Sequence, residues 1–292
     1  MLQVARLAPL ELGESRDLVA AFFKSRLNPD GGFQDRTGES DLYYTVFGLE
    51  GLVALQEEIP ARHVAPYLEA FDDGSGLDFV HLACLARCWA TVASNLTAVP
   101  PADAILAHLE TYRTPDGGYA QGRCAERGNA YAAFLALGTY QDLGRPLPDP
   151  HGLLASVAGL RSGDMAYSNQ PGDARGTTTV TAAAVMLLRA LGGAPDPHLG
   201  VWLLDRCQSN GGFLASAAAP IPDLLSTATG LHALAALDVP IAGLREACLD
   251  FVDSLWTNRG GFYGSWVDDD IDCEYTYYGL LALGHLRVGA PA

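Results

Sequence analysis

Three carboxylic acids lie within five residues near one end of the chain, at Asp270, Asp272 and Glu274. Acidic side chains held close together repel one another when charged, and burial in an apolar pocket penalises the charged form further. Both effects raise the pKa of a carboxyl group and keep it protonated near neutral pH. Such a group can act as a general acid. We therefore predict that this cluster holds the catalytic acid of an enzyme.

Aromatic residues are concentrated in the parts of the sequence that would surround such an acid. They are Tyr43, Tyr44, Tyr119, Tyr131, Phe262, Tyr263, Trp266, Tyr275, Tyr277 and Tyr278. Aromatic faces stabilise a cation without reacting with it, although aromatic residues also serve simply to fill a core. From this group we assign six residues to substrate binding: Tyr43, Tyr44, Tyr119, Trp266, Tyr275 and Tyr278.

The elements that must position these groups belong to a repeat. Its most recognisable part is a turn with two glycines and an aromatic residue, as in the segments 31–33 (GGF) and 117–119 (GGY). Six copies of the turn are marked by Gly31, Gly74, Gly117, Gly163, Gly211 and Gly260, in steps of 43, 43, 46, 48 and 49 residues. Each step has room for two helices, and a period of this size indicates a repeat architecture.

Each repeat contains two helices of different character. In the first repeat, residues 14–27 form an amphipathic pattern and residues 41–56 a more apolar one. An apolar helix of this kind is buried on both sides, whereas a helix with one charged face is half exposed. Six such hairpins form two concentric rings, so we predict an all-α (α/α)6 toroid, a single domain over residues 1–292. The turn glycines permit the positive φ that joins an outer helix to an inner one.

The inner helices share a pattern at their starts. Aligned without gaps, they open at Asp41, Asp78, Glu126, Thr177, Asp223 and Asp272, which is an acid in five of six repeats. An acid at a helix N-terminus caps free N–H groups, so these acids are mainly structural. Glu274 differs, because it is the only second carboxylate at its position in any repeat.

Bulk composition excludes several classes of function. The net charge of −16 argues against binding to nucleic acids or anionic membranes. The six cysteines form no C-x-x-C pair, which is typical of reduced thiols in a cytosol. No apolar stretch is long enough to span a bilayer. We expect a soluble, cytoplasmic protein.

Two segments resemble a known family. Residues 31–49, GGFQDRTGESDLYYTVFGL, and residues 207–213, CQSNGGF, are similar to the repeat of protein prenyltransferase β subunits and of squalene–hopene and other class II terpenoid cyclases. The resemblance covers essentially the whole chain and implies the toroid fold. It implies less about activity, because the same toroid also serves binding proteins and glycan enzymes.

The cyclases of this family carry Asp-x-Asp-Asp-Thr at one inner-helix start, where a protonated acid gives its proton to an alkene or epoxide. Anchored on Thr276, residues 272–276 (DCEYT) place Glu274 at the position of the acid. Two residues earlier, residues 270–273 (DIDC) also resemble the motif and place Asp272 there. We favour Glu274 because that register follows the helix alignment.

The prenyltransferases of the family imply zinc, bound by Asp-x-Cys and by a His at the next inner helix, together with a helical partner subunit. No aligned Asp-x-Cys position here holds cysteine, since Cys273 lies one residue early. The His position is filled only by His81, which we assign to substrate binding. Arg123, in the segment 122–124 (GRC), resembles a diphosphate-binding Gly-Arg and is assigned likewise.

The sequence therefore predicts a class II-type isoprenoid cyclase that needs no metal or other cofactor and acts on a small apolar isoprenoid. One alternative is a prenyltransferase β-subunit-like enzyme with zinc and an α-subunit partner. The other is a non-catalytic or glycan-binding toroid. A deep apolar tunnel ending at Glu274 or Asp272 would favour the cyclase, and a shallow polar cleft would favour the binding protein.

Overall fold

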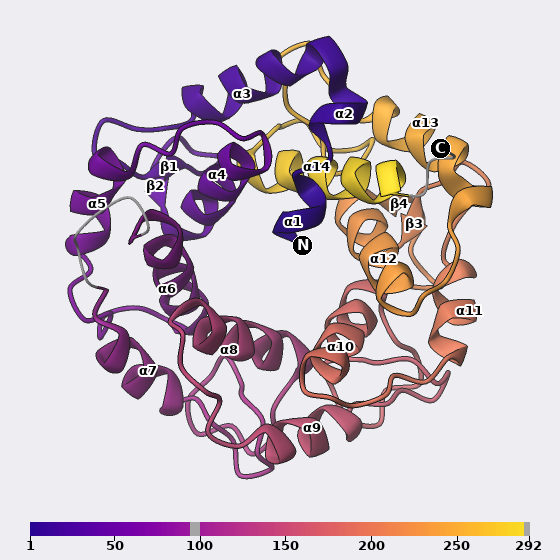
Figure 1. Cartoon of the computed structure of the whole chain (residues 1–292). Helices are drawn as coiled ribbons and strands as arrows, with labels where there is room; N and C mark the ends of the chain where they lie inside the picture. The colour runs from indigo at the N-terminus through magenta and orange to yellow at the C-terminus, as the bar shows by residue number, and fades with distance from the viewer. Residues whose placement is uncertain (94–99, 289–292) are drawn as a thin grey trace.

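The computed structural model describes residues 1–93 and 100–288, whose helices form two concentric rings (Figure 1). The inner ring consists of α4 (Leu42–Ala54), α6 (Phe79–Ala93), α8 (Ala130–Asp142), α10 (Thr178–Ala190), α12 (Leu224–Ala236) and α14 (Cys273–Val288). The outer ring consists of α3 (Arg16–Ser25), α5 (Ala61–Glu69), α7 (Ala102–Glu110), α9 (Pro150–Ala158), α11 (His198–Leu204) and α13 (Arg245–Ser254). This arrangement confirms the predicted (α/α)6 toroid.

The ring closes between its first and last repeats. Each inner helix contacts the next one along the chain, and α14 returns to contact α4 (Figure 1). The side-chain contacts that cross this seam include hydrogen bonds from Arg36 to Asp272 and from Tyr43 to Glu274. Residues more than 230 positions apart in the sequence therefore meet at a single place.

Short hairpins join the glycine turns to the inner helices. Strand β1 (Phe33–Gln34) pairs antiparallel with β2 (Ser40–Asp41), and β3 (Phe213–Leu214) pairs in the same way with β4 (Pro222–Asp223). The hydroxyl of Thr45 on α4 accepts a 2.9 Å hydrogen bond from the backbone N–H of Phe33. Thr227 on α12 does the same for Phe213. This bond fixes the turn aromatic against the start of the inner helix.

Acidic caps begin most inner helices, as the alignment predicts. Asp41 accepts hydrogen bonds from the N–H groups of Tyr43 and Tyr44, at 2.8 and 3.1 Å. The prediction for Glu126 is wrong, because α8 begins at Ala130 and its cap is Asn129. The gap-free alignment placed the start of this helix three residues too early.

The prediction that Gly163 is the turn glycine of the fourth repeat is also wrong. Gly31 has φ +97°, and a Cβ atom at this position would lie only 2.2 Å from the backbone oxygen of His63. The backbone bridge around this turn joins residues 27 and 33, and its equivalent in the fourth repeat joins residues 161 and 167. The position equivalent to Gly31 is therefore Met165, with φ +70°, and not Gly163.

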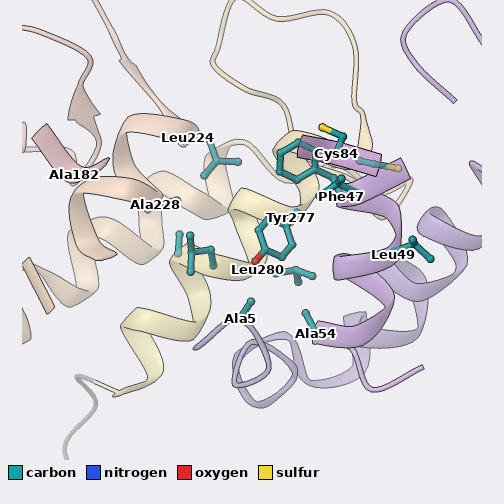
Figure 2. Close-up of a cluster of buried hydrophobic side chains, with 14 of the residues drawn as sticks. Ala5, Phe47, Leu49, Ala54, Cys84, Ala182, Leu224, Ala228, Tyr277 and Leu280 are labelled. Carbon is teal, nitrogen blue, oxygen red and sulfur yellow. The ribbon is translucent and has the colours of Figure 1, made fainter. Parts of the chain in front are cut away.

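The N-terminal helices pack against the inner ring. Helix α1 (Leu2–Ala5) lies inside the ring against α14 and α4, and α2 (Pro9–Leu12) follows it toward α3 (Figure 1). Gly284 on α14 permits this approach, because a Cβ atom there would lie 2.1 Å from the oxygen of Val4. Figure 2 shows part of the resulting core, to which Ala5, Phe47 and Tyr277 contribute. No helix within the described ranges is long and apolar enough to cross a membrane.

Candidate active site

A cavity lies within the ring between α4, α6, α8 and α14. It has about 680 Å³ of empty space, open solvent included, and its wall is largely apolar, with Val46, Phe47, Ala83, Phe134 and Leu135 among its lining residues. A second cavity of about 820 Å³, open solvent included, continues toward α10 and α12. The two cavities share several lining residues, namely Met1, Glu50, Arg87, Phe134 and Asp142.

Glu274 lies on the first turn of α14, at the end of the ring where the inner helices begin. Its Oε1 accepts a 2.6 Å hydrogen bond from the hydroxyl of Tyr43, which lines the cavity. Burial raises the pKa of Glu274 to about 7, and the charge of Asp272 acts in the same direction. The hydrogen bond from Tyr43 and the charge of Arg36 oppose this rise. Glu274 is thus a carboxyl group that still carries its proton near neutral pH.

Asp272 is held in a different way. Its side chain is only 3% exposed, and both of its oxygens have donors. Oδ1 caps α14 by accepting from the N–H of Tyr275 at 2.8 Å, and Oδ2 accepts from Nε of Arg36 at 2.8 Å. Burial raises the pKa of Asp272, whereas these two donors lower it. Because both donors stabilise the carboxylate, the geometry favours Glu274 over Asp272 as the proton donor.

Aromatic rings continue from Glu274 along the cavity wall. The rings of Tyr43 and Phe47 on α4 meet edge to face with centroids 5.0 Å apart, and the rings of Phe47 and Tyr278 are 5.6 Å apart. Tyr131 and Phe134 on α8 line the same cavity. Rings around an apolar space can stabilise a cation that forms within it.

A charged group marks the other end of the cavity. Arg87 on α6 donates from Nε to Oδ2 of Asp142 at 2.9 Å and from its NH1 group to Oε1 of Glu50 at 3.2 Å. These residues were not predicted from the sequence. A signal was available, because Glu50 and Arg87 are charged residues inside helices that are otherwise almost wholly apolar.

Three predicted residues lie close to the Glu274 end. Tyr44 packs edge to face on Tyr43, with centroids 5.7 Å apart. The ring of Tyr275 lies 5.4 Å from the guanidinium carbon of Arg36. His81 stands between two caps, with Nε2 3.1 Å from Asp41 and Nδ1 2.9 Å from Asp78. Its hydrogen bonds to Asp41 and then to Asp78 raise the pKa of His81 to about 9, so it is a paired cation at neutral pH.

Four predicted residues lie away from the cavity wall. Tyr119 is buried between the rings and donates to an acid on outer helix α7. Trp266 is 48% exposed and donates to a serine on outer helix α13. Arg123 is exposed and covers a tyrosine that follows α7, and Asp270 is an exposed residue in a small polar pocket beside Arg36. The sequence pattern alone does not show that the side chains of these turn and loop residues point away from the cavity.

The potential metal ligands are dispersed. Within residues 1–93 and 100–288, no group of three or more His, Cys, Asp or Glu side chains is arranged to hold a metal ion. Cys273 is fully buried, and this burial raises the pKa of its thiol well above the usual range. A neutral buried thiol is a poor metal ligand.

Known proteins resemble this chain in sequence and fold. The model of the prenyltransferase alpha-alpha toroid domain matches residues 11–74 and 195–289, together a little more than half of the chain. No curated protein sequence matches it.

Solved structures match over nearly the whole length. The type II terpene cyclase MstE from Scytonema, in complex with its substrate geranylgeranyl dihydroxybenzoate, has a TM-score of 0.63 at 15% identity, over 97% of this chain and 98% of that one. The apo form of MstE gives 0.62 at 14% identity, over 99% and 98%. A protein from Actinoplanes gives 0.64 at 16% identity, over 95% and 99%. At such identities the likeness concerns the fold.

Proposed function

Because the chain belongs to the prenyltransferase alpha-alpha toroid family, we propose that it is a class II-type isoprenoid cyclase with Glu274 as its general acid. The type II terpene cyclase MstE has the same fold and takes geranylgeranyl dihydroxybenzoate as substrate. That likeness supports an isoprenoid as the substrate class. The observation that carries the proposal is the position of Glu274, a carboxyl group with a pKa near 7 beside an aromatic-walled cavity.

The reaction begins with proton transfer from Glu274 to a carbon–carbon double bond of the bound chain. The O–H bond of the acid breaks, a C–H bond forms, and the neighbouring carbon becomes a cation. Tyr43 donates to Oε1, so Oε2 carries the proton, and the same hydrogen bond stabilises the carboxylate that remains. The hydrogen bond thus strengthens the acid at the moment of transfer.

Cyclisation of the bound isoprenoid chain then proceeds without further participation of charged side chains. Each remaining double bond of the chain attacks the cation in turn, forming a C–C bond and moving the charge along the chain. The rings of Phe47, Tyr278 and Phe134 face this path and stabilise the cation without attacking it. Loss of a proton from the last cation ends the sequence, and Glu274 regains a proton from solvent. The product is an isomer of the substrate.

A survey of substrates tests the proposal. Purified protein is incubated with linear prenyl alcohols, prenylated phenols, their epoxides and prenyl diphosphates, the products are separated by chromatography, and their masses are measured. A cyclase gives products of unchanged mass, and Glu274→Gln abolishes them because it keeps the size but lacks the transferable proton. Glu69→Gln, on the exposed end of outer helix α5, is the matched control and stays active. Isomeric products that persist in Glu274→Gln would contradict the assignment.

The two alternatives have less support. A prenyltransferase would use zinc to hold a thiolate, whereas Cys273 is fully buried and both carboxylate oxygens of Asp272 already accept hydrogen bonds, from Arg36 and from the start of α14. A glycan-binding toroid would present a polar cleft, whereas this wall is mainly aliphatic and aromatic. Stoichiometric zinc in the purified protein, or binding of oligosaccharides, would favour one of them over the cyclase.

A further inference from the structure

Two buried polar atoms at the charged end of the cavity have hydrogen-bonding capacity to spare. Among the described residues, Nε2 of His232 has no hydrogen-bond partner, and the hydroxyl of Tyr277 lies beside Glu50 without a well-formed hydrogen bond. Tyr277 is 1% exposed and lines the first cavity, while His232 is 9% exposed and lines the second. A buried polar atom without a partner is unfavourable by about 1–3 kcal/mol, and a bound ligand can supply the missing bond.

The two imidazoles at this end are neutral. Nδ1 of His232 lies 2.9 Å from Nε2 of His285, so the pair shares one hydrogen bond. Burial lowers the pKa of His232 to about 3 and that of His285 to about 4. His232 therefore offers Nε2 to the second cavity as a neutral donor or acceptor, depending on its tautomer.

The charged groups at this end of the cavity offer no unpaired cation to an anionic ligand. Arg87 is the one side-chain cation among the described residues that line the two cavities, since His232 is neutral. It already faces two carboxylates, Glu50 and Asp142. The N-terminal ammonium of Met1 lines both cavities as well, so the site holds two positive and two negative charges, and no positive charge is left uncompensated. An anionic ligand here would lie beside two carboxylates in a poorly solvated space. Repulsion between like charges is strong in such surroundings.

We infer that the residues Glu50, Arg87, Asp142, Tyr277 and His232 bind the polar end of the isoprenoid substrate, and that this end is an uncharged hydroxyl or phenol and not a diphosphate or carboxylate. The inference rests on the proposed function, since it takes the cavity to be the isoprenoid site. A hydroxyl group suits the site because it donates to a carboxylate and accepts from Tyr277 or Arg87. The substrate would then lie with a double bond at Glu274 and its hydroxyl at Arg87.

Binding measurements separate this inference from the cyclase proposal. Glu274→Gln, which does not turn over, is titrated by calorimetry with farnesol, farnesoic acid and farnesyl diphosphate, and with the same three geranylgeranyl compounds. In the farnesyl series, the geranylgeranyl series or both, the alcohol should bind about tenfold more tightly than the carboxylic acid and the diphosphate of the same chain length. This is a difference of about 1.4 kcal/mol in binding free energy. If an anion binds as tightly as the alcohol while the wild type still forms isomers, the inference fails and the cyclase proposal stands. If no compound binds or reacts, both fail.

Two sets of variants test the residues. Tyr277→Phe should weaken farnesol binding by about fivefold, the loss of one hydrogen bond, and leave binding of the hydrocarbon farnesene unchanged. Tyr112→Phe, a buried tyrosine outside the cavity lining, is the control. Equal weakening of both ligands in Tyr277→Phe would overturn the assignment.

The second set changes the charge. The double variant Glu50→Gln with Asp142→Asn leaves Arg87 without a carboxylate, so farnesyl diphosphate should bind about tenfold more tightly than before. If the melting curve shows that this variant is unfolded, Asp142→Asn alone is used, and a smaller gain in the same direction is expected. Asp103→Asn on outer helix α7 is the matched control. No gain for the diphosphate in a folded variant would contradict the inference.

Discussion

Tyr43 and Glu274 lie 231 positions apart in the chain, and the hydroxyl of one donates a 2.6 Å hydrogen bond to the carboxyl group of the other. The two residues belong to α4 and α14, the helices that meet where the ring closes. The environment of the candidate acid therefore exists only in the closed ring. Local sequence around Glu274 contains half of the site, and the first repeat supplies the other half.

Activity should depend on pH through Glu274. Its pKa is raised from 4.5 to about 7, so the acid form is present below this pH and is lost above it. Cyclisation should therefore be fastest below about pH 7 and fall as the pH rises through that value. The measurement is the initial rate of isomer formation across the pH range at saturating substrate. A rate that increases above pH 7 would contradict the role of Glu274 as an acid.

Tyr43→Phe should change both the rate and this pH profile. The lost hydrogen bond stabilises the carboxylate, so its removal should lower kcat by about tenfold to a hundredfold. The same loss should move the midpoint of the pH profile upward, because the bond lowers the pKa of Glu274. A merely structural tyrosine would lower the rate without moving the midpoint. Tyr112→Phe serves as the matched control.

Stability should respond to pH through the same group. A carboxyl group whose pKa is raised on folding contributes stability below its unfolded pKa, and this contribution is lost as the pH rises through its folded pKa. Glu274→Gln does not titrate, so its stability relative to the wild type should increase between about pH 4 and pH 8. The shift from 4.5 to about 7 corresponds to at most about 3 kcal/mol. Denaturant unfolding at several pH values measures this difference, with Glu69→Gln as the control.

Arg36 should stabilise the seam of the ring through its ion pair with Asp272. Arg36→Met leaves the carboxylate of Asp272 buried without this partner, and we expect a loss of about 1–3 kcal/mol in the free energy of unfolding. Adding Asp272→Asn to Arg36→Met should restore part of this loss, because the uncompensated charge is then removed. Arg145→Met breaks an exposed ion pair with Asp103 and should change stability by less than about 1 kcal/mol. Equal losses in the two arginine variants would contradict this account.

Met165 should be a site where glycine stabilises the protein. Its backbone has φ +70° at the turn position that Gly31 occupies in the first repeat. A left-handed conformation is unfavourable for a residue with a Cβ atom by about 1–2 kcal/mol, so Met165→Gly should gain about 1 kcal/mol. Gly31→Ala should instead destabilise the protein, because its Cβ atom would clash with the oxygen of His63. Thermal unfolding of the two variants measures both effects, and a loss of stability in Met165→Gly would contradict the first.

The architecture could be predicted from the sequence because each repeat contains the same short sequence patterns. The turn residues, the N-terminal caps and the all-round apolar character of the inner helices each recur about every 45 residues. The predicted position of a turn or cap is wrong where its sequence pattern departs from that of the other repeats. The fourth turn has Met165 in place of glycine, and the loop before α8 delays the cap from Glu126 to Asn129.

The site was predicted less completely, because it depends on which way each side chain points. Tyr119 and Trp266 are aromatic residues in the expected repeats, yet they pack toward the outer ring. Arg36 could not be paired with Asp272 from the sequence, since their contact depends on closure of the ring. Glu50 and Arg87 could have been found, because a charge inside a helix that is buried on all sides requires a partner.

The source of the added proton is the most direct test of the cyclase account. The protein is equilibrated in D2O, a prenyl substrate that it accepts is added, and the cyclised product is examined by mass spectrometry and NMR. Protonation by Glu274 predicts one deuterium in the wild-type product, at the CH carbon of the former terminal double bond, because protonation there leaves the tertiary cation at the dimethyl carbon. It also predicts no product from Glu274→Gln at pH 6. Cyclised product without deuterium, or deuterated product from Glu274→Gln at the wild-type rate, would contradict the account.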